Sequence, residues 1–297
     1  MESFSFIDLT AIHGRLKLCG EDKVDLLDRL STNDISTLKE TGQGISTVLT
    51  TNKGRIIDLL KVYFFTDHLM LVSDIESIKK VSEWIEFYTI MEDIIQFDVS
   101  NETFQIRIFS DEAQLVFPEI ESYKVDDFYI WDFGGIECVV IANKMNQKKC
   151  VDIIGQVSDK KTIIEYLKTR GTQLKSDQFE NIRISVGYPK FGTELTEEFN
   201  PLEALLIEHI SFNKGCYIGQ EVVARLNTYD KVQRQMVKLS SDTNLRLGDL
   251  KFQGKVVGKI TSVFNEEGIG FVKKNILLDT KQLEADESIV EINPITS

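Results

Sequence analysis

The stretch LLKVYFFTDHLMLVSD, residues 59–74, constrains the fold of this chain more than any other feature. It contains two apolar runs of strand length that are joined at Thr66-Asp67, and a connection this short lets two strands pair only in the antiparallel direction. Later runs, TFQIRIFS and IECVVIAN, have the same strand character. The pattern predicts an α+β fold with mostly antiparallel sheets and argues against a regular βαβ series.

Three segments carry the apolar spacing of amphipathic helices: residues 21–31, 73–89 and 160–170. In the second segment, Ser73 and Glu76 have the spacing of a capping box, which predicts a helix start there. A further helix is predicted in NPLEALL, residues 200–206, with an asparagine as N-cap and a proline in the first turn.

The character of the sequence changes after about Lys231. Short β-rich runs (KVQRQMVKLS, KVVGKITSVF, GIGFVKK and SIVEIN) follow one another, separated by turn residues and without a good helix among them. Such a series predicts a small β-barrel. We therefore divide the 297 residues into a core, residues 1–235, and a C-terminal barrel, residues 236–297.

The composition excludes several classes of function. There are 34 basic and 47 acidic residues, and a net charge of −13 argues against direct nucleic-acid binding, because phosphate binding needs a broad basic face. No apolar run approaches the roughly 18 residues that span a bilayer, so no membrane association is expected. The N-terminus MESFSFIDLT lacks signal- and transit-peptide character, which predicts a cytoplasmic protein.

The four cysteines, Cys19, Cys138, Cys150 and Cys216, are far apart and form no C-x-x-C pair. This spacing fits a reducing compartment and argues against a zinc ribbon or a self-contained iron–sulfur site, so no metal ligand set is predicted. The common phosphate-loop, dinucleotide and H-E-x-x-H motifs are also absent.

The segment with the strongest candidate reactive residues is FNKGCYIGQE, residues 212–221. Lys214 places a cation near Cys216, Gly215 and Gly219 permit backbone conformations that other residues avoid, and QEVVARL predicts a helix directly afterwards. A thiol near a lysine and a helix N-terminus is favoured as thiolate. From the residues alone, a reactive thiol and a buried turn that merely accommodates Cys216 are equally good interpretations.

Two other polar residues have simple interpretations when they are taken by themselves. His209 lies seven residues before Cys216 and could form a nucleophile pair with it, but a partly exposed surface histidine is the better prediction. Asp58, at the start of the strand in TTNKGRIIDLL, has the position of an ordinary solvated turn residue.

Three segments in order resemble the aminomethyltransferase of the glycine cleavage system: NKGRIIDLLKVY, GYPKFGTELTEEFNPLEA and FNKGCYIGQEVVAR, over about residues 5–275. Within that superfamily, KGCYIGQE is similar to the signature of the YgfZ family of folate-binding proteins tied to iron–sulfur cluster maintenance. The resemblance implies two interleaved α+β lobes and a C-terminal β-barrel around a central folate pocket, with tetrahydrofolate or a derivative as cofactor.

The resemblance also implies site residues. Cys216 becomes the functional thiol. Asp58 falls near the acidic position of the transferase strand and is the first candidate to pair with the ring N–H and amino donors of a reduced pterin. Glu137, in GGIECVV, is a second carboxylate candidate, and Lys214 and Arg225 are candidates for the glutamate tail or for holding the loop. The signature supplies the other cofactor-binding candidates, Gly215, Tyr217, Gly219, Gln220 and Glu221.

Three functions are compatible with these residues. The first is a tetrahydrofolate-binding accessory protein for assembly or repair of iron–sulfur clusters, in which Cys216 serves in redox or persulfide exchange or as a transient ligand. Because one cysteine cannot hold a cluster, carrier or client proteins are the implied partners. This hypothesis predicts one pocket lined by Asp58, Glu137 and residues 214–225.

The second function is a folate-dependent one-carbon transferase or demethylase, in which Asp58 steers a folate nitrogen. NKGRIID has one acidic residue where the transferase usually shows an Asp-Asp pair, and Cys216 is absent from the transferase, so this is the alternative. The third is a binding module in which KGCYIGQE only shapes the pocket wall.

Overall fold

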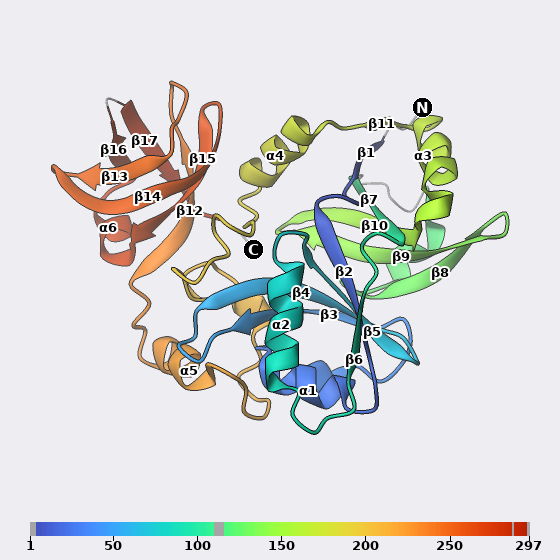
Figure 1. Ribbon diagram of the computed structural model, residues 1–297. Coiled ribbons are helices and arrows are strands. Elements are labelled where there is room, and N and C mark those ends of the chain that lie inside the picture. The colour runs from blue at the N-terminus through green and yellow to red at the C-terminus, as the bar shows by residue number, and fades with distance from the viewer. Residues whose placement is uncertain (1–3, 110–115, 287, 296–297) are drawn as a thin grey trace.

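The computed structural model describes residues 4–109, 116–286 and 288–295, and their strands form two open sheets and a closed barrel (Figure 1). The five-stranded sheet has the order β3-β4-β5-β2-β6. Its strands are β2 (His13–Cys19), β3 (Gly44–Thr50), β4 (Ile56–Phe64), β5 (His68–Asp74) and β6 (Ile95–Asp98). All of their pairings are antiparallel.

The six-stranded sheet has the order β11-β1-β7-β10-β9-β8. Its strands are β1 (Phe4–Asp8), β7 (Thr103–Phe109), β8 (Phe128–Phe133), β9 (Ile136–Met145), β10 (Lys148–Gln156) and β11 (Gly171–Gln173). From β1 in this sheet the chain passes to β2 to β6 in the other sheet and then returns at β7, so the two lobes are interleaved as predicted. The predicted α+β class with a terminal barrel is confirmed.

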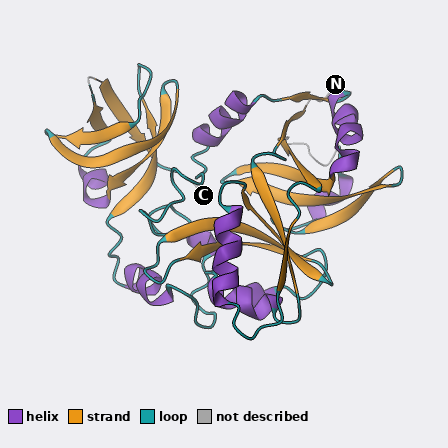
Figure 2. Ribbon diagram, in the orientation of Figure 1, coloured by secondary structure: helices purple, strands orange, loops and turns teal. Residues whose placement is uncertain are grey.

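The barrel, at the upper left of Figure 2, closes in the order β12-β15-β14-β13-β16-β17. Its strands are β12 (Arg234–Ser240), β13 (Gly248–Phe252), β14 (Lys255–Phe264), β15 (Glu267–Lys273), β16 (Gln282–Ala285) and β17 (Ser288–Asn293). The first strand begins next to the boundary proposed at residue 236. The rings of Phe199 and Phe271 stack with centroids 3.5 Å apart, and both are fully buried, so the barrel shares a core with the rest of the protein.

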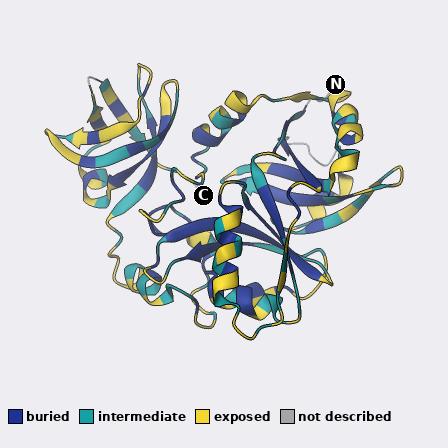
Figure 3. Ribbon diagram, in the orientation of Figure 1, coloured by how far each residue is buried: buried dark blue, intermediate teal, exposed yellow. Residues whose placement is uncertain are grey.

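The helices are α1 (Lys23–Leu30), α2 (Ile78–Tyr88), α3 (Lys160–Lys168), α4 (Ser176–Ser185), α5 (Gln220–Thr228) and α6 (Lys274–Asp279), with short 3-10 turns at Ile35–Thr37, Pro118–Ser122, Val157–Asp159 and Ile207–His209. Helices α1 and α2 pack on the five-stranded sheet and α3 packs on the six-stranded sheet, each with one buried side (Figure 3). Helices α4 and α6 contact the barrel, and α5 packs through Val223 on Leu202 and Ile210. Among the described residues, every helix is too short or too polar to cross a bilayer.

The predicted capping box at the start of α2 is wrong. Ser73 is still part of β5, whose pairing with β2 extends to Asp74, so it is not free to cap a helix. Helix α2 begins after Ser77, and the Asp74 carboxylate accepts a hydrogen bond from the Glu76 N–H at 2.9 Å. The β5 ladder therefore delays the helix by several residues.

Two other helix predictions also fail. Asn200 does accept hydrogen bonds from the N–H groups of Leu202 and Glu203 at 3.0 Å, as an N-cap would, but residues 201–205 form only a turn. Leu205 has φ of +59°, which ends the helical path. In the barrel, where no helix was expected, KNILLD forms the short helix α6.

Candidate functional site

A cavity of about 740 Å³ lies between the two sheets. Its walls come from β4 and β5 on one side, from β7 and the end of β9 on the other, and from α4 and residues 188–195. This volume lies within the usual range for small-molecule pockets, which combine apolar walls with a few polar groups. The apolar wall residues include Ile12, Leu59, Val72, Ile75, Met145, Phe179 and Leu195.

Asp58 is the carboxylate that β4 presents to this cavity. Its side chain is buried, at 1% exposure, and accepts a hydrogen bond from the Ser77 hydroxyl and another, at 2.8 Å, from the N–H of Leu59. Burial raises the pKa of Asp58 to about 7. The interpretation of Asp58 as a solvated turn residue is therefore wrong: it is a buried acid that holds its proton up to neutral pH.

His13, on β2, supplies a second polar group to the cavity wall. Its Nδ1 atom is buried and has no hydrogen-bond partner among the described residues. Burial lowers the pKa of His13 to about 3, so the imidazole is neutral at physiological pH. The Gln105 side chain, whose Oε1 atom is also unpaired in the described part of the chain, interacts with the ring and opposes this lowering of the pKa. His13 is therefore a neutral imidazole with a polar neighbour of its own.

The cations of the cavity wall are mostly neutralised by their own partners. Arg107 forms a two-pronged ion pair with Asp152, with both contacts at 2.7 Å. The other two buried cations also have acidic partners, in the pairs Lys61–Asp126 and Arg183–Glu194. Lys190, by contrast, has an exposed side chain, and its ammonium lies 4.0 Å from the Glu180 carboxylate. Lys190 is therefore the cation most available to an anionic group of a ligand.

Cys216 lies outside this cavity, in the loop before α5, and is exposed. The helix predicted after it is confirmed, since α5 begins at Gln220. The other described thiols differ in access: Cys138 and Cys150 are buried, and burial raises their pKa to about 11 and about 12. Cys19 is half-buried. Cys216 is thus the cysteine that a partner in solution reaches most readily.

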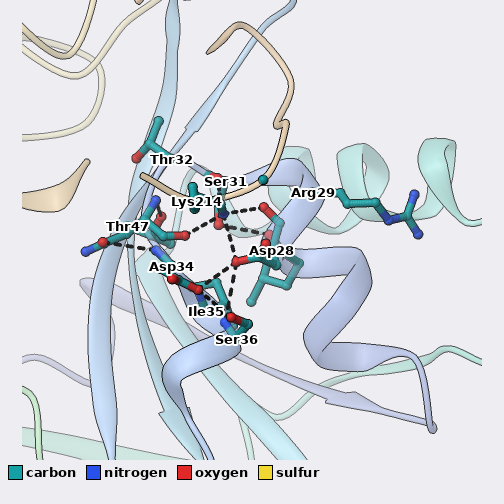
Figure 4. A network of polar contacts seen from close by, with 12 residues as sticks. Asp28, Arg29, Ser31, Thr32, Asp34, Ile35, Ser36, Thr47 and Lys214 are labelled. Atoms are coloured by element: carbon teal, nitrogen blue, oxygen red, sulfur yellow. Dashed lines mark hydrogen bonds and ion pairs between the residues drawn. The ribbon is translucent and has the colours of Figure 1, made fainter. Parts of the chain in front are cut away.

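The Lys214 side chain does not lie free beside Cys216 (Figure 4). Its ammonium lies 2.8 Å from the Asp28 carboxylate and donates to the carbonyls of Asp28, Ser31 and Asn33 at 2.6, 3.0 and 2.7 Å. The side chain is 1% exposed. Lys214 therefore anchors the loop to the end of α1, which agrees with one of its two predicted roles and leaves it without a free charge for a folate tail.

Gly219 holds the same loop against the turn that follows β3. It has φ of +87°, and a Cβ atom there would lie 2.5 Å from the Thr51 carbonyl oxygen. The Thr50 hydroxyl donates to the carbonyl of Ile218 at 2.6 Å, and a Cβ on Gly54 would lie 3.1 Å from the Val222 side chain. The two glycine-containing segments therefore pack on each other. Backbone contact and a positive φ favour glycine at position 219, and a φ of +65° together with the close Val222 side chain favours it at position 54.

The remaining predicted cofactor residues also lie away from the cavity. Tyr217 is buried, with its hydroxyl unpaired in the described part of the chain, and desolvation raises its pKa to about 12. Gln220, Glu221 and Arg225 belong to α5, and the last two are exposed. Glu137 is exposed on β9, opposite Asp132 of β8.

The expectation of a single pocket is not met. In the described part of the chain, the cavity wall contains Asp58 but neither Glu137 nor any of residues 214–225. Strand β4 explains the separation, because its first residues adjoin the turn that contacts the signature loop while Asp58 faces the cavity. The start of β4 and Asp58 are thus close on one strand but belong to two separate sites, the signature loop and the cavity.

Sequence reasoning also missed several residues of the cavity wall. Tyr188 and Lys190 lie in GYPKF, a segment already singled out by its resemblance to the transferase, so a signal for them was present. His13, and Ser77, which bonds Asp58 without lining the cavity, carried no such signal. Sheet pairing places His13 in the same wall as Asp58, and the packing of α2 on β2 and β4 brings Ser77 to it; neither is a local property of the sequence.

The two interleaved sheets, the attached barrel and the central cavity define a protein with the fold of the glycine-cleavage aminomethyltransferases. The crystal structure of glycine cleavage system aminomethyltransferase T from Bartonella henselae superposes with a TM-score of 0.83, covering 99% of this chain and 86% of that one, at 15% sequence identity. The family model described as the GCVT N-terminal domain matches residues 1–214, and the chain belongs to that family.

Several named proteins share moderate sequence identity with this chain. A chloroplastic protein of Arabidopsis thaliana, provisionally named as a transferase (At1g60990), is 28% identical over 280 residues, which is 88% of this chain and 63% of the relative. The aminomethyltransferases of Thermotoga petrophila and Thermoanaerobacter pseudethanolicus are 27% and 25% identical, over 84% and 93% of this chain and 71% and 78% of theirs. The chain thus spans less than two thirds of the Arabidopsis relative.

Proposed function

We propose that this protein binds tetrahydrofolate in the cavity between its two sheets and acts through Cys216 in the assembly or repair of iron–sulfur clusters. The observation that carries the proposal is the separation of two sites: a cavity whose wall contains the buried Asp58, and an exposed thiol on a well-anchored loop. With the thiol outside the cavity, a ligand can occupy the cavity while Cys216 meets another protein.

Folate binding is supported by the chemistry of the cavity. Proteins of the GCVT family bind tetrahydrofolate. The apolar wall suits the flat pterin ring, and protonated or ionised Asp58 can pair with the ring nitrogens and amino group. The neutral imidazole of His13 lies in the same wall, and Lys190 is the cation that would meet the carboxylates of the glutamate tail.

Two observations favour the role of Cys216: its thiol is exposed to solvent, and contacts at both ends hold its loop in place. Its loop is fixed by Lys214 at one end and by Gly219 and α5 at the other, so the thiol is held in place without being covered. A single thiolate supplies one ligand of a cluster, or one partner in thiol exchange, and a carrier or client protein would supply the other ligands. The distant positions of the other three cysteines in the sequence agree with this need for a partner.

One observation favours the alternative of a folate-dependent one-carbon transferase. An acid of pKa about 7 inside a ligand cavity can both hold and release a proton near neutral pH, which is the property of a general acid–base. Relatives named aminomethyltransferase are also similar over most of this chain. In this case Asp58 would be the working residue, and Cys216 would have no part in turnover.

The decisive experiment compares Cys216→Ser, Asp58→Asn and the control Cys19→Ser. Each variant is tested for tetrahydrofolate binding by calorimetry and for rescue of iron–sulfur enzyme activity in a strain that lacks the protein. We expect Cys216→Ser to retain folate binding and lose rescue, Asp58→Asn to weaken folate binding, and Cys19→Ser to behave as wild type. Full rescue by Cys216→Ser would reject the thiol role, and turnover of an aminomethyl donor that depends on Asp58 alone would establish the transferase.

A further inference from the structure

A second large depression lies between α5 and the barrel, with a volume of about 1060 Å³. We call it the α5 groove. One wall is formed by α5 and residues 230–235, and the other by the end of β15 and α6, while Lys53 and Arg55 close one side. It shares no wall residue with the cavity that contains Asp58, and Cys216 does not line it. The groove is therefore a separate surface.

The charge of the α5 groove is opposite to that of the protein as a whole. The chain carries a net charge of −13, yet the groove wall has six basic and only two acidic side chains: Lys53, Arg55, Lys231, Arg234, Lys273 and Lys274 against Glu203 and Asp230. Such a concentration of one sign in a concave surface attracts ligands of the other sign.

Both acidic residues of the groove are already engaged. Glu203 is buried and forms ion pairs with Arg234 at 3.1 Å and Arg55 at 3.7 Å, and Asp230 pairs with Lys274 at 2.7 Å. The other three cations, Lys53, Lys231 and Lys273, are exposed and have no carboxylate within 4.0 Å among the residues that the structure describes. Three positive charges are thus available to a partner.

Apolar side chains accompany these charges. Leu278 is 89% exposed, and Val222, Leu226 and Leu277 line the walls as half-buried residues. A leucine so fully exposed beside a concave surface is the pattern of an apolar contact with a polar rim, as in protein interfaces. The groove therefore offers both positive charge and a hydrophobic contact.

We propose that the α5 groove is a docking surface for an acidic, amphipathic segment of a partner protein. Carboxylates of the segment pair with Lys53, Lys231 and Lys273, and an apolar side chain packs against Leu278. The charge complementarity favours a protein of another kind over a second copy, because a two-fold dimer through this surface would place the same six cations against each other.

Nucleic acid is a poorer occupant for two reasons. The strongly acidic chain around the groove would repel a polyanion longer than the groove itself. The groove wall also has no aromatic side chain among its described residues, and the exposed Tyr229 ring beside it already faces the Lys231 ammonium, 5.5 Å from its centroid, so a run of unpaired bases would lack a stacking platform. The docking proposal does not depend on folate binding or on Cys216, since neither site contributes a residue to the groove.

The test uses the full chain and a fluorescein-labelled peptide of Glu, Asp and Leu that forms an amphipathic helix, with a Gln/Asn/Leu peptide as the neutral counterpart. The groove variant is Lys53→Glu with Lys231→Glu. The matched control is Lys149→Glu with Lys168→Glu, which makes the same charge change at exposed lysines on β10 and α3. Urea unfolding confirms that both variants are folded.

By fluorescence anisotropy at low salt, we expect the acidic peptide to bind wild type at least about tenfold more tightly than the neutral one. The groove variant should bind about tenfold or more weakly, the control within about twofold of wild type, and Leu278→Ser more weakly than wild type. Equal binding of the groove variant and the control would overturn the proposal. So would tighter binding of an RNA oligonucleotide than of the acidic peptide, or self-association in sedimentation that the groove variant abolishes.

Discussion

The ammonium of Lys214 lies 2.8 Å from the carboxylate of Asp28, 186 positions earlier in the chain, and caps the carbonyls at the end of α1. The lysine of the signature is therefore a structural anchor between the first helix and the Cys216 loop (Figure 4). Within the signature, Lys214 therefore builds the loop, and Cys216 remains available for chemistry.

Replacing Lys214 by methionine should destabilise the protein by about 3 kcal/mol. The substitution leaves Asp28 without its cation and three carbonyls without a donor, in a place where water has little access. Urea unfolding measures the change in free energy. The control Lys168→Met, at an exposed helix position, should stay within about 0.5 kcal/mol of wild type. A loss below about 1 kcal/mol for Lys214→Met would contradict the anchoring role.

Gly219→Ala should cost about 2 to 4 kcal/mol. The new methyl group would meet the Thr51 carbonyl, and alanine would be strained at φ of +87°. Gly215→Ala is the matched control, four residues away in the same loop, because a Cβ there meets open space and no left-handed φ is involved. We expect thermal and urea unfolding to distinguish the two clearly; equal stability of the two variants would show that the loop rearranges.

Asp58 should make the protein less stable as the pH rises from about 4 to 7. The unfolded chain releases the proton of this acid near pH 3.8 and the folded chain near pH 7, so between these values only the unfolded state is ionised. Between pH 5 and pH 7.5 this contributes a loss of about 2 kcal/mol. Urea unfolding of wild type and Asp58→Asn at both pH values measures it, because the variant lacks this contribution. Identical pH profiles would mean that Asp58 titrates normally.

His13 should act in the opposite direction within the same pH range. Its pKa falls from 6.5 to about 3 on folding, so below pH 6.5 the unfolded chain takes up a proton that the folded chain does not. Stability is complete above that pH and is lost as the pH falls, by about 1 to 2 kcal/mol at pH 5. His13→Gln should remove this loss. If the variant and wild type lost stability equally on acidification, the imidazole would not be held neutral.

The reactivity of the cysteine thiols should decrease as their burial increases. With a disulfide reagent at pH 8 the native protein should show one fast thiol, and Cys216→Ser should remove it. Cys138 and Cys150 should react only after unfolding, because burial keeps them protonated and covered. Cys19→Ser serves as the control and should retain the fast phase. A fast phase that persists in Cys216→Ser would assign the accessible thiol to another position.

Much of the fold could be predicted from local patterns. The hairpin of β4 and β5, the helices α1, α2, α3 and α5, and the change to a barrel near Lys231 are all visible as apolar periodicity and turn residues. Helix ends were less predictable. Ser73 and Glu76 match a capping box in sequence, but pairing of β5 with β2 keeps that segment extended, and a left-handed residue at Leu205 stops the next predicted helix.

The candidate sites were predicted only in part. The sequence by itself determined which residues are unusual: a single acid after NKGRII, a cysteine between two glycines, and a helix that begins at Gln220. Only the tertiary structure decided where these residues point. Desolvation in the folded protein raises the pKa of Asp58, against the opposing effect of the Ser77 hydrogen bond, and the ion pair with Asp28 engages the Lys214 ammonium, so it is not free to act on the thiol. Side-chain direction and burial depend on contacts between segments far apart in the chain, and no local pattern contains them.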